Sequence, residues 1–293
     1  MDYTMENELL KVTVTTYGAQ VKSVIRKCDG VEHMWQADPA VWGYHAPILF
    51  PYAGKLRDGK YTLEGKTYEN CKPHGFARIS EHRFASQDET SITLELTDSP
   101  ETMALWPFRF RLLSVFTLEG DTLHHTLTVE NHDQAPMPFG IGYHPGFAIP
   151  FDDKHTFSDY VLAFDQMESP LCLGVSPAGL MNKTWYSIGS NFQTIPVDEH
   201  LFDNDSHCMT GLSSRTLGLY EKDTGRGVVC SIRNFPYVLI WSKPGEPKFI
   251  CIEPWHSLPS TVDSNYDMME KPAAAILAPE ESWSTTLSTC FVR

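Results

Sequence analysis

Apolar and polar residues alternate with a period of two along most of this 293-residue chain. The segments LLKVTVTTYG (9–18) and AQVKSVIRKC (19–28) show the pattern on either side of a glycine. Successive side chains of a β-strand point to opposite faces, so this alternation is typical of strands that bury one face. The pattern therefore predicts two paired strands near the start of the chain and an all-β fold.

Further strand signals recur at intervals of roughly 8 to 12 residues, the spacing typical of β-sandwiches. The segment 58–69 predicts a compact hairpin that turns at Glu64-Gly65, and SPETMALWPF (99–108) predicts one helical turn with Ser99 as its N-cap. The two longest signals are 108–120 and 122–131, and others are 92–98, 215–222, 227–234, 237–243, 249–255 and 283–293. We expect a single domain over residues 1–293, a large antiparallel β-sandwich of about twenty strands with few short helices.

The chain is strongly acidic, with a formal net charge of −14 and a pI of about 5.2. An acidic surface repels phosphate backbones and anionic lipids, which argues against nucleic-acid and membrane partners. No apolar run approaches the ~20 residues of a membrane span, and the amino terminus lacks the pattern of a signal peptide. The seven cysteines are scattered without a CxxC pair, as expected of free thiols in a reducing compartment. We therefore expect a cytoplasmic protein.

Three short segments place polar side chains in apolar surroundings: KPHGFAR (72–78), GIGYHPGF (140–147) and CIEPWHS (251–257). Between them they supply His74, Arg78, His144 and Glu253. Glu253 follows the apolar run FICI, and a carboxylate at the end of a buried strand is costly unless it is paired or functional. A purely structural role for it would be an ion pair with an arginine.

The two histidines are also open to purely structural roles. His74 lies between a proline and a glycine, so it belongs to a turn, where most histidines are simply solvated. His144 has apolar neighbours and is equally consistent with a core histidine that donates to a backbone carbonyl. Arg78, four residues after His74, adds a second cation and indicates that this segment faces a polar or anionic target.

The motifs of several catalytic classes are missing from the chain. No HExxH or paired-cysteine spacing indicates a metal site, and His124 and His125, if on a strand, face opposite sides. Neither a GxSxG nucleophile motif nor a phosphate-binding glycine loop is found. A carboxylate, two histidines and an arginine remain. A carboxylate that accepts a proton and an imidazolium that gives one suit acid–base chemistry on a small neutral molecule, with no cofactor.

The chain is also rich in tryptophan, whose flat apolar faces can stack on the C–H groups of a sugar. Five tryptophans are candidates for this role, although we expect most of them in the core: Trp35, Trp42, Trp185, Trp241 and Trp255.

Taken together, the motifs resemble the aldose 1-epimerase (mutarotase) family, and within it the LacX-like branch of bacterial proteins. The residues that carry the resemblance are LFPYAGKLRDGKYTLEGKTY, HGFAR, GYHPGFAIP with FSDYVLAFD, LFDNDSHC, CIEPW and ILAPEESWSTTLS. They occur in the order of the family, from about residue 48 to the carboxyl end. The resemblance implies the galactose mutarotase-like supersandwich, with an open monosaccharide-binding cleft on one sheet.

The resemblance also implies roles for individual residues. His144 matches the histidine that protonates the ring oxygen, Glu253 the general base, and His74 a second histidine beside the reacting centre. Asp205 matches an acidic residue that holds sugar hydroxyls, and Arg78 is expected near the cleft.

Two positions depart from the branch. Lys55 replaces the usual arginine, and Arg57 is expected to share a strand face with it and to substitute as a sugar contact. After CIEPW the sequence HSLPS replaces a glycine-containing turn, so the loop beyond Glu253 is expected to differ in shape.

The function implied is interconversion of the α and β anomers of an aldohexose such as glucose or galactose by a monomer or homodimer. Two alternatives stay open. The first is a hexose-6-phosphate mutarotase in which Lys55, Arg57 and Arg78 bind the phosphate. The second is a non-catalytic carbohydrate-binding or sensing protein on the same fold.

Overall fold

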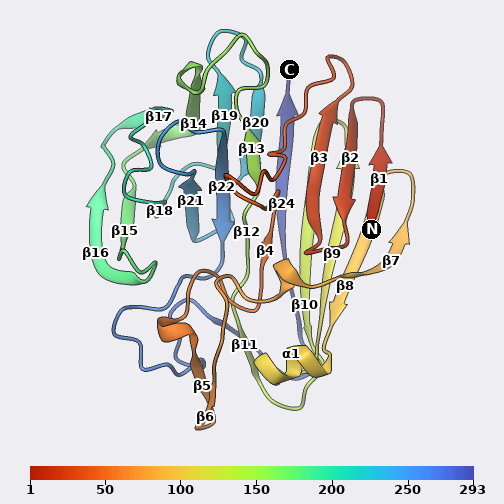
Figure 1. The fold of residues 1–293 in the computed structure, drawn as a ribbon, viewed down its shortest axis with the longest axis vertical. Helices are drawn as coiled ribbons and strands as arrows, with labels where there is room; N and C mark the ends of the chain where they lie inside the picture. Colours follow the sequence, from red (N-terminus) through yellow and green to blue (C-terminus); the bar gives the residue numbers. More distant parts are fainter.

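The structure is a computed structural model that describes residues 1–293 and contains 24 β-strands and four short helices. The helices are α1 (Pro100–Leu105) and the 3-10 helices η1 (Arg57–Gly59), η2 (Ala77–Ile79) and η3 (Phe157–Asp159). Most strands belong to two large antiparallel sheets (Figure 1). The all-β expectation is confirmed.

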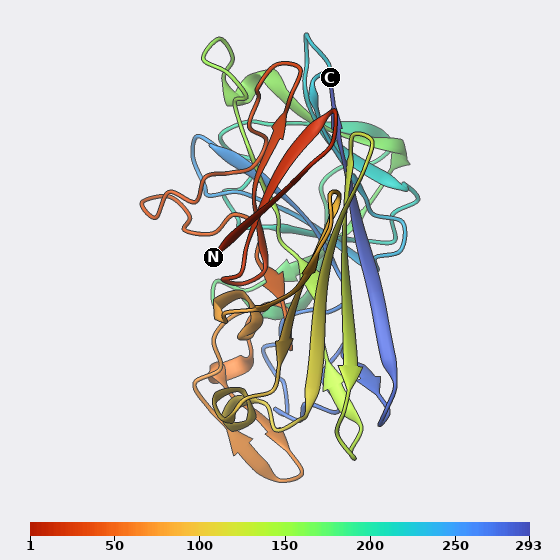
Figure 2. The same cartoon turned by 90° about the vertical axis from the view of Figure 1, so that its right-hand side faces the viewer.

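The larger sheet has nine strands, and its centre is built by long strands of strict alternation. In β9 (Phe110–Glu119) and β10 (Thr122–Asn131) every second residue is buried, so one face of the sheet packs inward. The two strands pair from the turn at Gly120-Asp121, as expected, and Figure 2 shows β9, β10 and β24 running side by side. The order of the sheet is β17 (Phe192–Pro196), β14 (Tyr160–Glu168), β19 (Thr216–Glu221), β20 (Gly227–Ser231), β24 (Ser282–Val292), β10, β9, β8 (Ser91–Thr97), β7 (Arg83–Gln87).

The second sheet has eight strands and carries the candidate site. Its central strand, β22 (Phe249–Trp255), is buried at every residue, so both of its faces are covered. The order is β16 (Met181–Ser187), β15 (Leu171–Val175), β18 (His207–Thr210), β21 (Tyr237–Trp241), β22, β12 (Gly142–Tyr143), β4 (Ile48–Leu49), and β13 (Gly146–Ala148) also pairs with β22.

The two large sheets enclose a core of 57 buried hydrophobic residues. A smaller cluster of eight, among them Leu173, Cys208, Leu239 and Trp255, lies against the outer face of the eight-stranded sheet. This second cluster covers the face of β22 that points away from the main core. The sandwich therefore has a sheltered outer surface on which polar groups can be held away from water.

Three smaller sheets complete the fold: β1 (Asp2–Glu6) with β2 (Leu10–Thr15) and β3 (Gln20–Arg26), β5 (Tyr61–Leu63) with β6 (Lys66–Tyr68), and β11 (Met137–Phe139) with β23 (Ala275–Leu277). The predicted pairing at the start of the chain is confirmed by β2 and β3. The β5–β6 hairpin, which projects from the lower end in Figures 1 and 2, turns at Glu64-Gly65 as predicted. Both residues have positive φ angles, 50° and 76°, as a tight two-residue turn requires.

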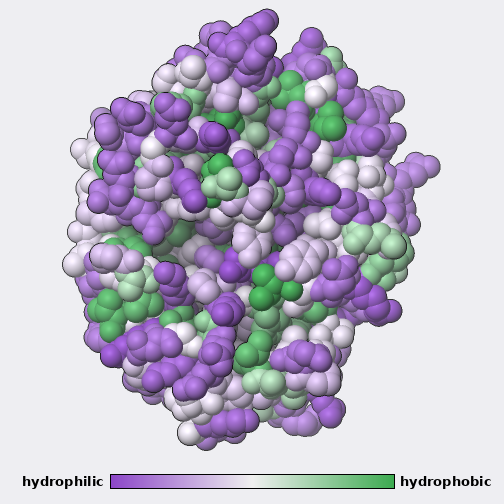
Figure 3. Space-filling model, viewed as in Figure 1, coloured by the Kyte–Doolittle hydropathy of each residue, from purple (hydrophilic) through white to green (hydrophobic).

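The predicted helical turn is α1, where the Ser99 hydroxyl accepts the backbone N–H of Thr102 at 3.2 Å. None of the helices has the length and apolar character needed to cross a membrane. The surface seen in Figure 3 is mostly hydrophilic, with hydrophobic residues in small groups.

Candidate functional site

The site is built on β22, where alternation sends every second side chain outward. Ile250 and Ile252 belong to the main core, while Cys251, Glu253 and Trp255 point to the opposite face. Glu253 is 1% exposed. The strand therefore carries a carboxylate under the cover of the smaller hydrophobic cluster, as the segment FICIEPW predicts.

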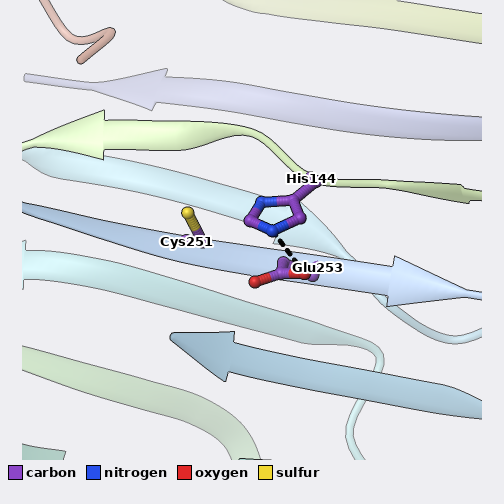
Figure 4. A group of neighbouring side chains, drawn as sticks. All are labelled: His144, Cys251 and Glu253. Atoms are coloured by element: carbon purple, nitrogen blue, oxygen red, sulfur yellow. Dashed lines mark ion pairs between the residues drawn. The ribbon is translucent and has the colours of Figure 1, made fainter. Parts of the chain in front are cut away.

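His144 reaches Glu253 from the neighbouring segment between β12 and β13, and its Nε2 lies 3.3 Å from Glu253 Oε2 (Figure 4). Its ring stacks on Trp42, with centroids 5.0 Å apart, and meets Trp241 edge-on at 5.7 Å. The backbone N–H of His144 donates to the Pro47 carbonyl at 3.1 Å. The partner of Glu253 is thus a histidine and not an arginine, and the imidazole is held between two indoles.

His74 lies on the turn that the sequence indicates, with a φ of +65°. The backbone N–H of Gly54 donates to His74 Nδ1 at 3.1 Å, so the proton of the neutral ring is on Nε2. The ring centroid is 5.5 Å from that of His144 and 5.7 Å from that of Trp255. His74 is therefore a fixed hydrogen-bond donor beside the His144–Glu253 pair.

The turn that carries His74 depends on the glycine that follows it. Gly75 has a φ of +70°, and a Cβ at this position would lie 2.2 Å from the carbonyl oxygen of Phe50. Only glycine combines that backbone conformation with so close an approach. Gly75 of the HGFAR segment is therefore required for a structural reason. It allows the His74 turn to pack closely against Phe50, the residue that follows β4.

These side chains line one cavity of about 240 Å³ that opens to solvent. Its lining residues are Trp42, Gly54, Lys55, Pro73, His74, His144, Val175, Pro177, Gly179, Met181, Asp205, Ser206, Cys208, Leu239, Trp241, Glu253, Trp255 and Pro259. A pocket that combines apolar walls with convergent polar groups is the usual form of a small-molecule site.

Burial sets the electrostatics of the pair. It raises the pKa of Glu253 well above its ordinary value, and the negative charge of Asp205 adds to the effect. Burial lowers the pKa of His144 to about 3 and that of His74 well below its ordinary value. A deprotonated Glu253 is therefore a strong base and a protonated His144 a strong acid, the separation that acid–base catalysis requires.

Five of the seven predicted site residues lie in this cavity: His74, His144, Glu253, Lys55 and Asp205. The Lys55 ammonium donates to the Ala178 carbonyl at 3.0 Å. Asp205 lies on an exposed turn with a φ of +73°. Both lie on loops, Lys55 after β4 and Asp205 just before β18.

The two arginines do not line the cavity. Arg57 and Lys55 share no strand face, so that expectation is wrong, because the chain leaves extended structure here and Arg57 begins η1. The Arg57 guanidinium donates to the Ser264 carbonyl at 2.7 Å and covers the Tyr266 ring at 4.9 Å. The Arg78 guanidinium lies over the Tyr44 ring at 4.7 Å. Both cations are already engaged by aromatic faces.

The expectation that most of the five tryptophans lie in the core is also wrong, since only Trp255 is buried. Trp42, Trp241 and Trp255 line the cavity, and Trp185 is 55% exposed on the edge strand β16. Apart from them, sequence reasoning missed the loop residues Pro73, Pro177, Gly179, Ser206 and Pro259, and the strand residues Val175, Met181, Cys208 and Leu239. A signal for some of them existed, because Ser206 and Cys208 lie in the LFDNDSHC segment of the resemblance and Pro73 directly precedes His74.

His144, Cys251 and Glu253 also bring a nitrogen, a sulfur and an oxygen within 4.8 Å of one another (Figure 4). This donor set suits zinc, although the chain has none of the usual zinc spacings. Burial raises the pKa of the Cys251 thiol well above its ordinary value, so a metal ion would have to displace that proton. A metal ion here would occupy the two groups that form the pair, so metal binding and proton transfer by them exclude each other.

A sequence model of the family described as aldose 1-epimerase matches residues 1–265, which include every segment that lines the cavity. Protein LacX (chromosomal) of Lactococcus lactis subsp. lactis is 30% identical over 286 residues, which is 95% of each chain. The structure of a galactose mutarotase related enzyme from Lactobacillus acidophilus has a TM-score of 0.95 at 30% identity, over 100% of this chain and 98% of that chain. A galactose mutarotase-like protein from Lactobacillus casei ATCC 334 has a TM-score of 0.92 at 27% identity, with 99% of each chain covered.

Proposed function

Since the chain belongs to the aldose 1-epimerase family, we propose that it interconverts the α and β anomers of an unphosphorylated aldohexose by acid–base ring opening and closing. The observation that carries the proposal is the contact of 3.3 Å between His144 Nε2 and Glu253 Oε2 inside a small cavity. A base and an acid held this close can act on two oxygen atoms bonded to the same carbon.

In the first step, the Glu253 carboxylate takes the proton from the anomeric hydroxyl. The electron pair of that O–H bond forms the C1 carbonyl, the bond from C1 to the ring oxygen breaks, and the ring oxygen takes a proton from His144 Nε2. Rotation about the C1–C2 bond then presents the other face of the aldehyde. The reverse transfers close the ring to the other anomer and restore both side chains.

The proton count shows how burial acts on the states of this reaction. The ionic pair, with His144 protonated and Glu253 deprotonated, holds the same number of protons as the neutral pair. Ring opening converts the ionic pair into the neutral one, and a low-dielectric site favours neutral groups. The burial that shifts both pKa values therefore favours the open-chain intermediate over the ionic pair from which it forms. The same burial makes the neutral pair the resting state, so a proton must first pass from Glu253 to His144 across the contact of 3.3 Å.

Other cavity groups suit a sugar's hydroxyls and C–H surfaces. His74 Nε2–H is a neutral donor beside the reacting centre, and Asp205 is an acceptor on the loop before β18. The indoles of Trp42 and Trp241 offer apolar faces next to His144. This mixture of one fixed donor, one carboxylate and aromatic walls fits a polyhydroxylated ring.

The direct test follows freshly dissolved α-glucose and α-galactose by polarimetry. We expect the protein to accelerate mutarotation of at least one aldohexose, and the same rate after dialysis against EDTA because the steps need only proton transfers. Sugar binding without any rate enhancement would establish the non-catalytic alternative instead. Activity that is lost with EDTA and restored by zinc would overturn the acid–base mechanism.

The phosphorylated alternative makes a different prediction. Lys55 is the only lysine or arginine that lines the cavity, and Asp205 adds an opposing negative charge. We expect kcat/KM for glucose to exceed that for glucose 6-phosphate by at least about tenfold, equivalent to ~1.4 kcal/mol. Mutarotation of both sugars is measured by polarimetry at matched ionic strength, and a preference for the phosphate would reverse the assignment.

A further inference from the structure

A second, much smaller cavity lies behind His144, between the two large sheets. It measures about 30 Å³ and shares only His144 with the sugar cavity. Most of its walls are apolar, and its polar side chains are those of His144, Tyr143, His125 on β10 and Thr289 on β24. His144 thus faces the proposed substrate on one side and this small space on the other.

Two ring nitrogens at this second cavity have no hydrogen-bond partner in the protein: Nδ1 of His144 and Nε2 of His125. The two residues are 8% and 6% exposed. A buried polar atom without a partner is rare and costly, so two beside one cavity point to a shared cause.

The His125 ring is held firmly in place. It stacks on Phe116 with centroids 4.1 Å apart, and the His125 carbonyl accepts the hydroxyl of Tyr143 at 2.7 Å. Tyr143 directly precedes His144 and also donates to the Thr285 carbonyl at 2.8 Å, so its hydroxyl is already engaged. A group that must hold a partner at a fixed position benefits from such packing.

We propose that one buried water molecule in this cavity joins His125 Nε2 to His144 Nδ1, and that His125 is a positioning residue for the acid His144. A cavity holds one water molecule when it offers roughly 10–15 Å³ or more and at least two polar partners. The cavity, whose lining includes both histidines with their unpartnered nitrogens, meets both conditions. Thr289 supplies a third polar group.

The direction of the hydrogen bonds follows from the chemistry of the rings. His144 Nδ1–H donates to the water oxygen, and the water donates to the lone pair of His125 Nε2. Burial lowers the pKa of His125 to about 3, so this ring stays neutral and one of its two nitrogens keeps a lone pair. In the proposed arrangement that lone pair is on Nε2 and the ring proton is on Nδ1. With its Nδ1 proton committed, His144 has only Nε2 to exchange the proton with the sugar, as the proposed function, on which this role of His125 rests, requires.

The first test needs only the parent protein. We expect a high-resolution crystal structure to show one ordered water molecule between the two rings. Nitrogen-15 NMR of the histidine rings should place the proton of neutral His144 on Nδ1. A dry cavity, or His144 with its proton on Nε2, would overturn the proposal. Neither readout depends on activity, so these results stand even if no aldose is mutarotated.

The second test compares two variants of similar shape. His125→Met removes the acceptor, and we expect kcat to fall about 10- to 100-fold, by analogy with the loss of a partner that orients a metal-binding histidine, with KM changed less than about twofold. His125→Gln keeps an acceptor oxygen and should restore most of kcat and the Nδ1 proton of His144. Equal loss in both variants, or parent kcat in His125→Met, would contradict the proposal.

Discussion

Replacing Glu253 with glutamine is expected to lower kcat for aldohexose mutarotation by roughly 10²–10⁴-fold. Glutamine keeps the shape of the side chain and can still hydrogen-bond to His144, but its amide cannot accept the proton of the anomeric hydroxyl. The folded state should not suffer, since the amide is neutral and has the shape of the neutral carboxyl group that burial favours at a residue that is 1% exposed. Polarimetry gives the rate, and thermal melts give the stability.

A matched control is Glu221→Gln, which changes a buried glutamate that lines no part of the cavity. The Glu221 carboxylate accepts the Arg226 guanidinium at 2.8 Å and the Tyr160 hydroxyl at 2.7 Å. Removing its charge should lower the melting temperature while leaving kcat unchanged. The two variants are thus expected to show opposite patterns, and a Glu253→Gln protein that is folded and fully active would refute the proposed base.

Replacing His144 with asparagine should cause the second large loss, again roughly 10²–10⁴-fold in kcat. Asparagine cannot carry a proton to the ring oxygen, and Glu253 loses the partner that lies 3.3 Å away. Because both residues serve one proton-transfer cycle, the double variant should lose little more than either single variant. A double-mutant cycle measured by polarimetry checks this.

His200→Asn is the control for loss of an imidazole, since the His200 side chain is 75% exposed and lies outside the cavity. We expect its kcat and melting temperature to match the parent. If His144→Asn also keeps the parent rate while folded, His144 is not the acid, and His74 becomes the residue to examine next.

Alternation is enough to predict most strands, because burial of one face leaves a period of two in the sequence. The unbroken apolar run FICI likewise predicts the buried position of Glu253, because such a run is typical of a strand that is covered on both faces. Pattern alone leaves open which strands are neighbours. The pairing of β10 with β24 and the pairing of β22 with β21 depend on long-range packing. A local sequence pattern does not report such packing.

Two of the residues that sequence reasoning misplaces, Arg57 and Trp42, lie outside the strands. Alternation puts Arg57 beside Lys55 on a strand, yet η1 turns its side chain toward Ser264 and Tyr266, residues far along the chain. The indole of Trp42 faces His144 only because of the course of the loop between β3 and β4. Loops follow the contacts available in the folded protein, so their side chains are the least predictable part of such a site.

The cavity is lined by segments that span residues 42 to 259, and the sheets behind it join residue 122 to residue 290. Pairings between such distant residues form slowly, because the chain must close long loops before the contacts stabilise it. Catalytic competence should therefore return only at the end of refolding. The rate of mutarotation therefore reports completed folding. During refolding it should recover later than any spectroscopic signal from an individual hairpin.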